Sequence, residues 1–154
     1  MSVASKSDEE MLALVRSRIA ALHEIAPDSI GDLMRFELIS CDPEAGEYEL
    51  RCKTEAWMRN AAGTLHGGMC AAVLDQAMGF LAYCVKPGEG QAPTVQLQVS
   101  YYRPLIPGED VAIRVKVESV TRSLMHLRGE ASLASSPARI CVSASAIYFY
   151  KPNA

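Results

Sequence analysis

The sequence predicts an α+β domain in which one antiparallel sheet wraps around a single long helix. Residues 65–85 contain no proline and have small or apolar side chains on every side, as expected for a helix that is buried all round. Four segments with alternating apolar positions follow this helix, and their short connections favour antiparallel pairing. These segments are residues 95–101, 111–117, 125–133 and 140–150.

Two further elements are predicted before the long helix. Residues 8–24 carry apolar side chains at helical spacing behind Ser7, a residue type suited to a helix N-cap, and indicate an amphipathic helix. Between residues 33 and 55 the period changes to two, and a turn at residues 42–46 makes this stretch a hairpin with one wet face. We therefore expect a helical extension over residues 1–27 and a domain with a sheet of about five to six strands over residues 28–154.

Composition restricts the classes of protein to which the chain can belong. Its 154 residues, 49% of them hydrophobic, suffice for one domain whose core needs no metal or disulfide. The net charge of −3 provides no positive field for a phosphate backbone, so nucleic acid is not expected as a partner. No uninterrupted apolar stretch approaches the roughly 20 residues of a membrane span. Five widely spaced cysteines favour reduced thiols, and we expect a soluble, cytoplasmic protein without a membrane partner.

One carboxylate stands out within the long helix. Asp75 is the only formally charged residue between Gly67 and Val85. Burying an unpaired carboxylate costs several kcal/mol, so this acid either meets a structural partner or faces a cavity where its reactivity is useful. The helix alone leaves both interpretations open.

The segment before the helix places two adjacent glycines directly after His66. The first N–H groups of a helix have no intrahelical acceptor, and the positive end of the helix dipole favours an oxyanion. Two glycines can equally serve a tight turn, and His66 alone can be an ordinary residue at a helix start. Their position ahead of Asp75 indicates an active site.

The chain resembles the hotdog-fold acyl-CoA thioesterases of the phenylacetate-degradation type. The resemblance rests on one combined motif: Asn60-x-x-Gly63-x-x-His66-Gly67-Gly68, followed after six residues by Asp75. The coarse pattern agrees over nearly all of residues 28–150, including residues 101–104 and 107–110 between strands. The resemblance implies a hotdog fold and the hydrolysis of an acyl or aryl-acyl thioester, with coenzyme A as part of the substrate.

The resemblance also implies roles for individual residues. Asp75 would activate water or attack the thioester directly, and the Gly67 N–H would polarise the thioester carbonyl. Asn60 would assist at that carbonyl, while His66 would shape the same pocket. Thr94 is the match for a hydroxyl that holds the water, although many relatives carry serine there.

The spacing of two of these residues predicts an oligomer. Gly67 and Asp75 are eight residues apart, roughly 12 Å along one helix, too far for both to contact one thioester carbon. Two such helices packed antiparallel across a two-fold axis would bring Gly67 of one subunit near Asp75 of the other. We therefore expect a homodimer with shared sites, and the resemblance implies that two dimers pair into a homotetramer.

Other candidate residues are less specific. Four residues are candidates for binding the coenzyme A portion: Gly68 at the helix start, and Arg103, Arg122 and Ser123 near strand ends. The two arginines suit phosphate oxygens but can equally be solvated surface residues. Cys70 lies one helical turn after His66, but no third group supports a metal site, and a small buried thiol explains it better. Phosphate-loop, dinucleotide and zinc-protease motifs are missing from the sequence, so no cofactor or metal is predicted.

Two other functions remain as alternatives. On the same fold, His66 with the acid on the helix could dehydrate or hydrate a hydroxyacyl thioester, although the surrounding residues resemble the thioesterase arrangement. A non-catalytic regulator that binds acyl-CoA would need a DNA-reading module. About thirty N-terminal residues with one helix and no basic recognition helix are too few for such a module.

Overall fold

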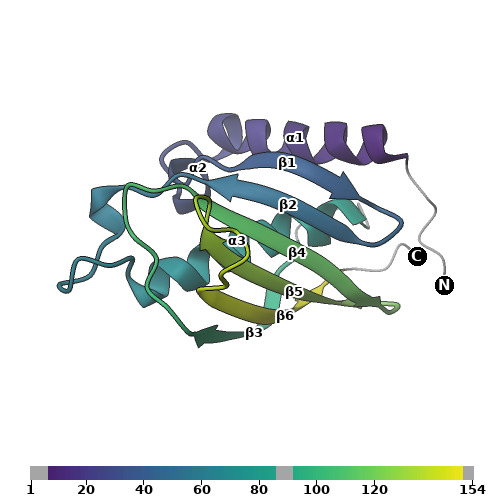
Figure 1. The fold of residues 1–154 in the computed structure, drawn as a ribbon. Helices are drawn as coiled ribbons and strands as arrows, with labels where there is room; N and C mark the ends of the chain where they lie inside the picture. Colours follow the sequence, from purple (N-terminus) through teal and green to yellow (C-terminus); the bar gives the residue numbers. More distant parts are fainter. Residues whose placement is uncertain (1–6, 86–91, 151–154) are drawn as a thin grey trace.

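The computed structural model describes residues 7–85 and 92–150, whose main elements follow the predicted order (Figure 1). The helices are α1 (Asp8–Ile25), α2 (Ile30–Leu33), the 3₁₀ helix η1 (Ala56–Met58) and α3 (Gly67–Val85). The strands are β1 (Glu37–Asp42), β2 (Glu47–Cys52), β3 (Thr94–Tyr101), β4 (Val111–Val120), β5 (Leu124–Leu133) and β6 (Val142–Phe149). The predicted α+β class is confirmed, and each segment expected to contain strands does so.

The described strands form one antiparallel sheet in the order β1-β2-β4-β5-β6-β3. The predicted β1–β2 hairpin is at one edge, and its expected wet face is confirmed because Tyr48, Leu50 and Cys52 are buried while their neighbours along β2 are more exposed. The other edge is β3, which the chain reaches through α3. Among the described strands β3 pairs only with β6, so its outer edge remains open for a further strand.

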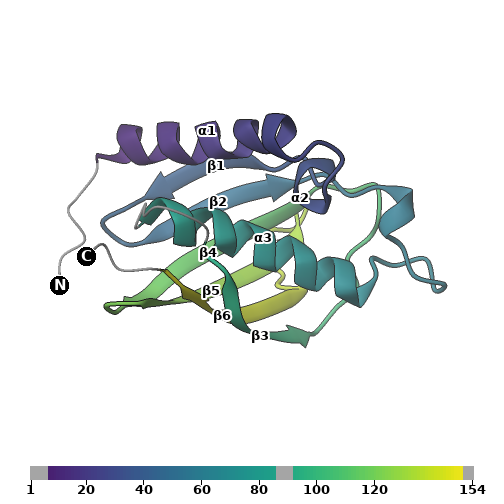
Figure 2. The ribbon, with the colours of Figure 1, turned by 180° about the vertical axis from the view of Figure 1, so that it is seen from behind.

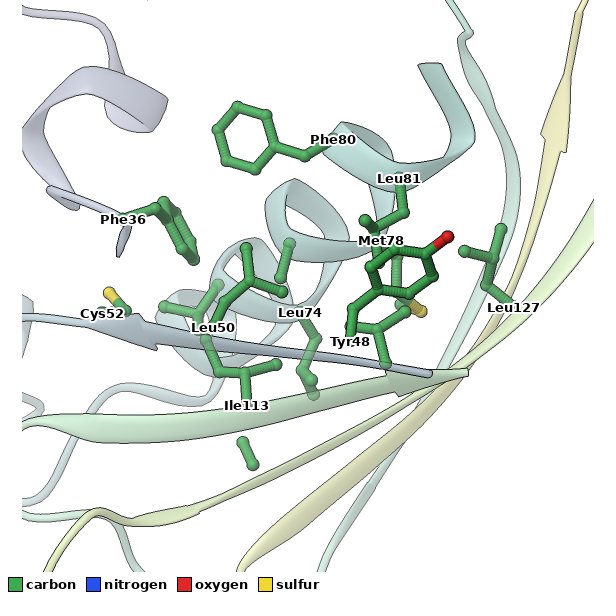
Figure 3. Close-up of a cluster of buried hydrophobic side chains, with 14 of the residues drawn as sticks. Phe36, Tyr48, Leu50, Cys52, Leu74, Met78, Phe80, Leu81, Ile113 and Leu127 are labelled. Carbon is green, nitrogen blue, oxygen red and sulfur yellow. The ribbon is translucent and has the colours of Figure 1, made fainter. Parts of the chain in front are cut away.

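The core lies between α3 and the face of the sheet that curves around it (Figures 2 and 3). Buried side chains of the helix meet buried side chains of three strands: Leu74, Met78 and Leu81 against Leu50, Ile113 and Leu127. By length and composition α3 could also cross a membrane, but 56% of its most apolar window is buried inside the fold. The core therefore accounts for the apolar character of this helix.

The sheet approaches α3 closely at Gly129 of β5. A Cβ atom at this position would lie 3.0 Å from Leu74 Cδ2 and 3.3 Å from Met78 Sδ. The glycine thus leaves the space that these two helix side chains occupy. On the helix itself, the neighbour that a Cβ atom on Gly79 would meet among the described residues is the Tyr148 ring, at 3.7 Å.

The predicted N-terminal helix is confirmed as α1. Ser7 and Glu10 form a capping box, in which each side chain accepts a hydrogen bond from the other residue's N–H. Met11 and Val15 are buried in the same core as α3. The helix packs on β1 and α3 and covers one side of the fold (Figure 2).

The sequence analysis did not predict α2 and η1, because three or four residues show no readable periodicity. Ser29 caps α2 by accepting a hydrogen bond from the Asp32 N–H. Gly31 of α2 is buried where α1 and α3 meet, with Leu22 Cδ1 and Gln76 Oε1 only 3.3 and 2.8 Å from the position of a Cβ atom. This short helix therefore fixes one end of the contact between α1 and α3.

Candidate active site

The side chain of His66 caps the first turn of α3. His66 Nδ1 accepts a hydrogen bond from the Gly68 N–H at 2.9 Å. A neutral ring that accepts at Nδ1 carries its proton on Nε2, so the other side of this exposed ring is a donor. The structure thus places His66 directly before α3, where its side chain caps the N-terminus of the helix.

Capping by His66 leaves one donor at the helix start available. Within the described residues no acceptor binds the Gly67 N–H, whereas the Gly67 carbonyl oxygen accepts a hydrogen bond from the Tyr101 hydroxyl at 2.8 Å. A Cβ atom on Gly67 would lie 3.6 Å from the Tyr101 ring, an ordinary contact distance. Of the two adjacent glycines, Gly67 keeps a free N–H at the positive end of the helix dipole, as an oxyanion donor requires.

Asn60 organises the loop before α3. Its Oδ1 accepts hydrogen bonds from the N–H groups of Ala62 and Thr64 at 3.0 and 3.1 Å. Its Nδ2 donates to Thr64 Oγ1 at 2.9 Å, and Gly63 makes the turn with a φ of 82°. Because one amide hydrogen is used in this way, Asn60 can offer only the second hydrogen of Nδ2 to a substrate.

The carboxylate of Asp75 is fixed on one oxygen by two hydroxyl groups. Thr94 Oγ1 donates to Asp75 Oδ1 at 2.8 Å, as expected for the hydroxyl on the strand after the helix. The Tyr148 hydroxyl lies 2.8 Å from the same Oδ1 and 2.7 Å from the main-chain oxygen of Asp75. Over residues 7–85 and 92–150, no cation pairs with Asp75 and no donor reaches Oδ2. One oxygen is therefore held while the other is available as a base or nucleophile.

Tyr148 is the neighbour of this carboxylate that the sequence analysis missed. Its side chain is 1% exposed, and burial, followed by the charge of Asp75, raises its pKa. The phenol therefore stays neutral and acts as a hydrogen-bond donor. The only signal in the sequence was general, since a buried tyrosine hydroxyl needs an acceptor and Asp75 is the one acid in the buried helix.

A cavity adjoins this group. Asp75, Thr94 and Tyr148 line a space of about 390 Å³ between α1, α3 and the segment that enters β3. A larger cavity of about 570 Å³ lies against β1, β2, β4 and β5, contains the Glu47–Lys116 ion pair and has no lining residue from α3. The smaller cavity is the candidate site because it combines a usable volume with an available carboxylate oxygen.

The candidates for the coenzyme A portion lie at two opposite ends of β3. Arg103 follows the C-terminal end of β3, where its Nη1 donates to the Ile140 carbonyl oxygen at 2.8 Å. Arg122 and Ser123 form the turn between β4 and β5, and the Ser123 carbonyl accepts a hydrogen bond from the Tyr150 N–H at 3.0 Å. This turn lies at the end of the sheet where β3 begins. The structure therefore does not bring Arg103 together with the other two within one chain.

Cys70 has the properties of a core residue. It is 4% exposed, and burial raises its pKa to about 11, so the thiolate needed for nucleophilic attack is scarce at neutral pH. In the part of the chain that the structure describes, no group of three or more His, Cys, Asp or Glu side chains could hold a metal ion. The five cysteines all lie among the described residues, and no disulfide joins any two of them.

Residues 62–136, which contain Gly67, Asp75 and Thr94, match the sequence profile of the Thioesterase superfamily. This part of the chain is therefore similar to the thioesterase superfamily. The human and Pongo abelii proteins named acyl-coenzyme A thioesterase 13 are each 32% identical to the chain over 85 residues. The aligned segment spans 55% of this chain and only 59% of each of these relatives.

Solved structures confirm the hotdog fold. A phenylacetic acid degradation-related protein from Ralstonia eutropha JMP134 superposes with a TM-score of 0.76 at 21% identity, covering 89% of this chain and 99% of that chain. A Streptococcus mutans UA159 protein bound to acetyl-CoA gives a TM-score of 0.66 at 17% identity, covering 77% and 90% of the two chains. The resemblance to hotdog thioesterases of the phenylacetate-degradation type, inferred from the Asn60–Asp75 motif, is thus confirmed.

Proposed function

We propose that the chain is an acyl-CoA thioesterase, which hydrolyses an acyl or aryl-acyl thioester to the free acid and coenzyme A. The observation that carries this proposal is the carboxylate of Asp75, held at Oδ1 by Thr94 and Tyr148 and available at Oδ2. The superfamily match, the name of the human relative and the acetyl-CoA bound to the Streptococcus mutans neighbour support it. The reaction needs only water as a second reactant, so the proposal includes no cofactor.

In the proposed reaction, Asp75 Oδ2 removes a proton from a water molecule while the water oxygen attacks the thioester carbonyl carbon. The Gly67 N–H of the partner subunit donates to the carbonyl oxygen as negative charge develops on it. The carbon–sulfur bond then breaks, and the thiolate of coenzyme A leaves and recovers the proton. Direct attack by Oδ2, giving an anhydride that water cleaves, remains an alternative at the same residue.

The geometry of β3 supports a site shared between two subunits. At its start Thr94 contacts Asp75, and at its end Tyr101 contacts the Gly67 carbonyl. Antiparallel pairing of two copies of this open edge strand would place Thr94 beside Tyr101 of the partner subunit. Asp75 would then approach the partner's Gly67. This pairing would complete the site, because Gly67 and Asp75 of one chain lie roughly 12 Å apart along α3.

The same pairing would unite the candidates for the coenzyme A portion. Arg122 lies at the Thr94 end of β3 and Arg103 follows its Tyr101 end, so Arg122 would approach Arg103 of the partner subunit. Two guanidinium groups from different subunits suit the phosphate groups of coenzyme A. A homodimer, paired again into a tetramer in the reducing cytoplasm, is the form of the protein that we propose.

Replacement of Asp75 by asparagine tests the proposal, because the change keeps the shape of the side chain and removes its charge. We expect turnover of a panel of acyl-CoAs, measured as released thiol, to fall by about 10² to 10⁴-fold while KM changes little. The matched control Asp42→Asn removes an exposed carboxylate from the end of β1 and should leave turnover unchanged. Unchanged turnover of a folded Asp75→Asn protein would contradict the proposed mechanism.

The two alternatives predict different results in the same panel. A regulator would bind acyl-CoA and release no thiol from any substrate. A dehydratase would depend on His66 as an acid or base, but its Nδ1 is engaged by the Gly68 N–H. No observation in the structure favours either alternative over hydrolysis.

A further inference from the structure

The candidate cavity continues from Asp75 along the contact between α1 and α3. The two helices run antiparallel, since Leu22 and Gln76 meet around Gly31 while Arg18 stacks over Tyr83 farther along (Figure 2). The Arg18 guanidinium carbon lies 4.0 Å from the centroid of the Tyr83 ring. The cavity therefore has the available carboxylate near one end and this stacked pair near the other.

We propose that this cavity holds the acyl group of the substrate and that α1 forms one of its walls. This inference rests on the proposed function and adds the class of acyl group to it. The lining from α1 and α3 is largely aliphatic or aromatic, and Ile25 at the end of α1 is 74% exposed. An exposed large apolar side chain beside a carboxylate-lined cavity suits an apolar ligand that covers it.

The length of the cavity limits the acyl chain. Asp75 and Tyr83 are eight residues apart on α3, which corresponds to roughly 12 Å along the helix. A zigzag alkyl chain built from bonds of about 1.5 Å advances by about 1.3 Å per carbon, so about nine carbons fill this distance. The substrate class is therefore a straight, apolar acyl thioester of medium chain length, whose end meets the Arg18–Tyr83 pair.

Gly79 provides the width that such a chain needs. It lies one helical turn after Asp75 and lines the cavity, and among residues 7–85 and 92–150 a Cβ atom there would contact only Tyr148, at 3.7 Å. A larger side chain at this position would enter the cavity about 6 Å from Asp75, which leaves room for only about five carbons. Ala21 of α1 lines the cavity from the other helix, whereas Ala20 is exposed and lies outside it.

Binding of S-alkyl-CoA thioethers tests this inference without requiring catalysis, because these analogues cannot be hydrolysed. Calorimetric titration of the wild-type dimer should show affinity rising by about fourfold per methylene, with a plateau near nine carbons. In Gly79→Leu the plateau should move to about five carbons, so the nonyl analogue binds on the order of 100-fold more weakly. The thermal melt should show that the variant remains folded, since leucine is a better helix former than glycine.

A second pair of variants tests the wall supplied by α1. Ala21→Leu should also weaken the nonyl analogue more than the butyl analogue, whereas Ala20→Leu, with the same added bulk outside the cavity, should reproduce the wild-type profile. Equal chain-length profiles for all four proteins would overturn the inference, even if the wild type hydrolyses thioesters. Shifted profiles in a protein without hydrolytic activity would instead support the acyl site and reject the proposed function.

Discussion

Replacing Tyr148 with phenylalanine tests how the carboxylate of Asp75 is held. The change removes a hydroxyl that lies 2.8 Å from Asp75 Oδ1 and keeps the buried ring in place. Thr94 still donates to the same oxygen, so the carboxylate loses one of its two hydroxyl partners. The variant therefore reports on positioning and charge without removing the reacting group.

The magnitude follows from the geometry of this hydrogen bond. A hydrogen bond to a charged acceptor contributes about 1.5 to 3 kcal/mol, and the lower end applies because Asp75 is only partly buried. A loss of about 1.5 kcal/mol in the positioning of the carboxylate corresponds to about tenfold in rate. We therefore expect kcat to fall by about tenfold because Oδ2 is less well oriented, while KM changes little.

Steady-state kinetics, with a thermal melt on the same preparation, separates this role from a structural one. The control Tyr48→Phe removes the hydroxyl of another buried tyrosine, on β2 outside the candidate cavity. It should leave kcat and KM of the wild type unchanged. If Tyr148→Phe lowers the melting temperature but leaves kcat per folded site unchanged, the positioning role assigned to Tyr148 is wrong.

Three further predictions follow from the described residues. Cys70→Ala should leave turnover within about twofold of wild type, and Cys70 should resist alkylation at pH 8, because burial raises the thiol pKa to about 11; loss of turnover would restore a nucleophilic role. Gly129→Ala should lower the free energy of unfolding in urea by about 1 to 3 kcal/mol, because the new Cβ lies 3.0 Å from Leu74 Cδ2; an unchanged midpoint would mean that the helix can move away. Gly67→Pro should fold but be nearly inactive, because proline is tolerated at the first helical position and lacks the N–H. Mixing it with the nearly inactive Asp75→Asn chain should restore up to one working site per mixed dimer, because the intact Asp75 and Gly67 then lie on opposite subunits. No recovery on mixing would refute the shared site.

The strands and long helices could be predicted because each satisfies a local rule. Alternation along residues 111–117 and 125–133 reports which side chains face the core, and the unbroken apolar character of residues 65–85 reports a helix covered on all sides. The short helices α2 and η1 gave no such signal. Their positions depend on contacts such as that of Gly31 with the side chains of Leu22 and Gln76.

The candidate site could be predicted where its residues are close in sequence. Asn60, His66, Gly67 and Asp75 lie within sixteen residues, and their spacing resembles a known motif. The specific roles within that segment came from the structure. The structure shows that the Gly68 N–H donates a hydrogen bond to His66 Nδ1, whereas the Gly67 N–H has no acceptor among the described residues.

The sequence by itself determined the fold class, the order of elements and the central acid, because periodicity, helix breakers and a lone charge are properties of neighbouring residues. Tertiary structure decided which distant groups surround that acid. Tyr148 reaches Asp75 from a strand 73 residues away, and α1 lines the cavity beside it. Alternation shows that Tyr148 faces inward, but its partner depends on how far β6 is shifted relative to α3. That shift is fixed only when the whole sheet has closed around the helix, since sheet register and helix packing are properties of the assembled core.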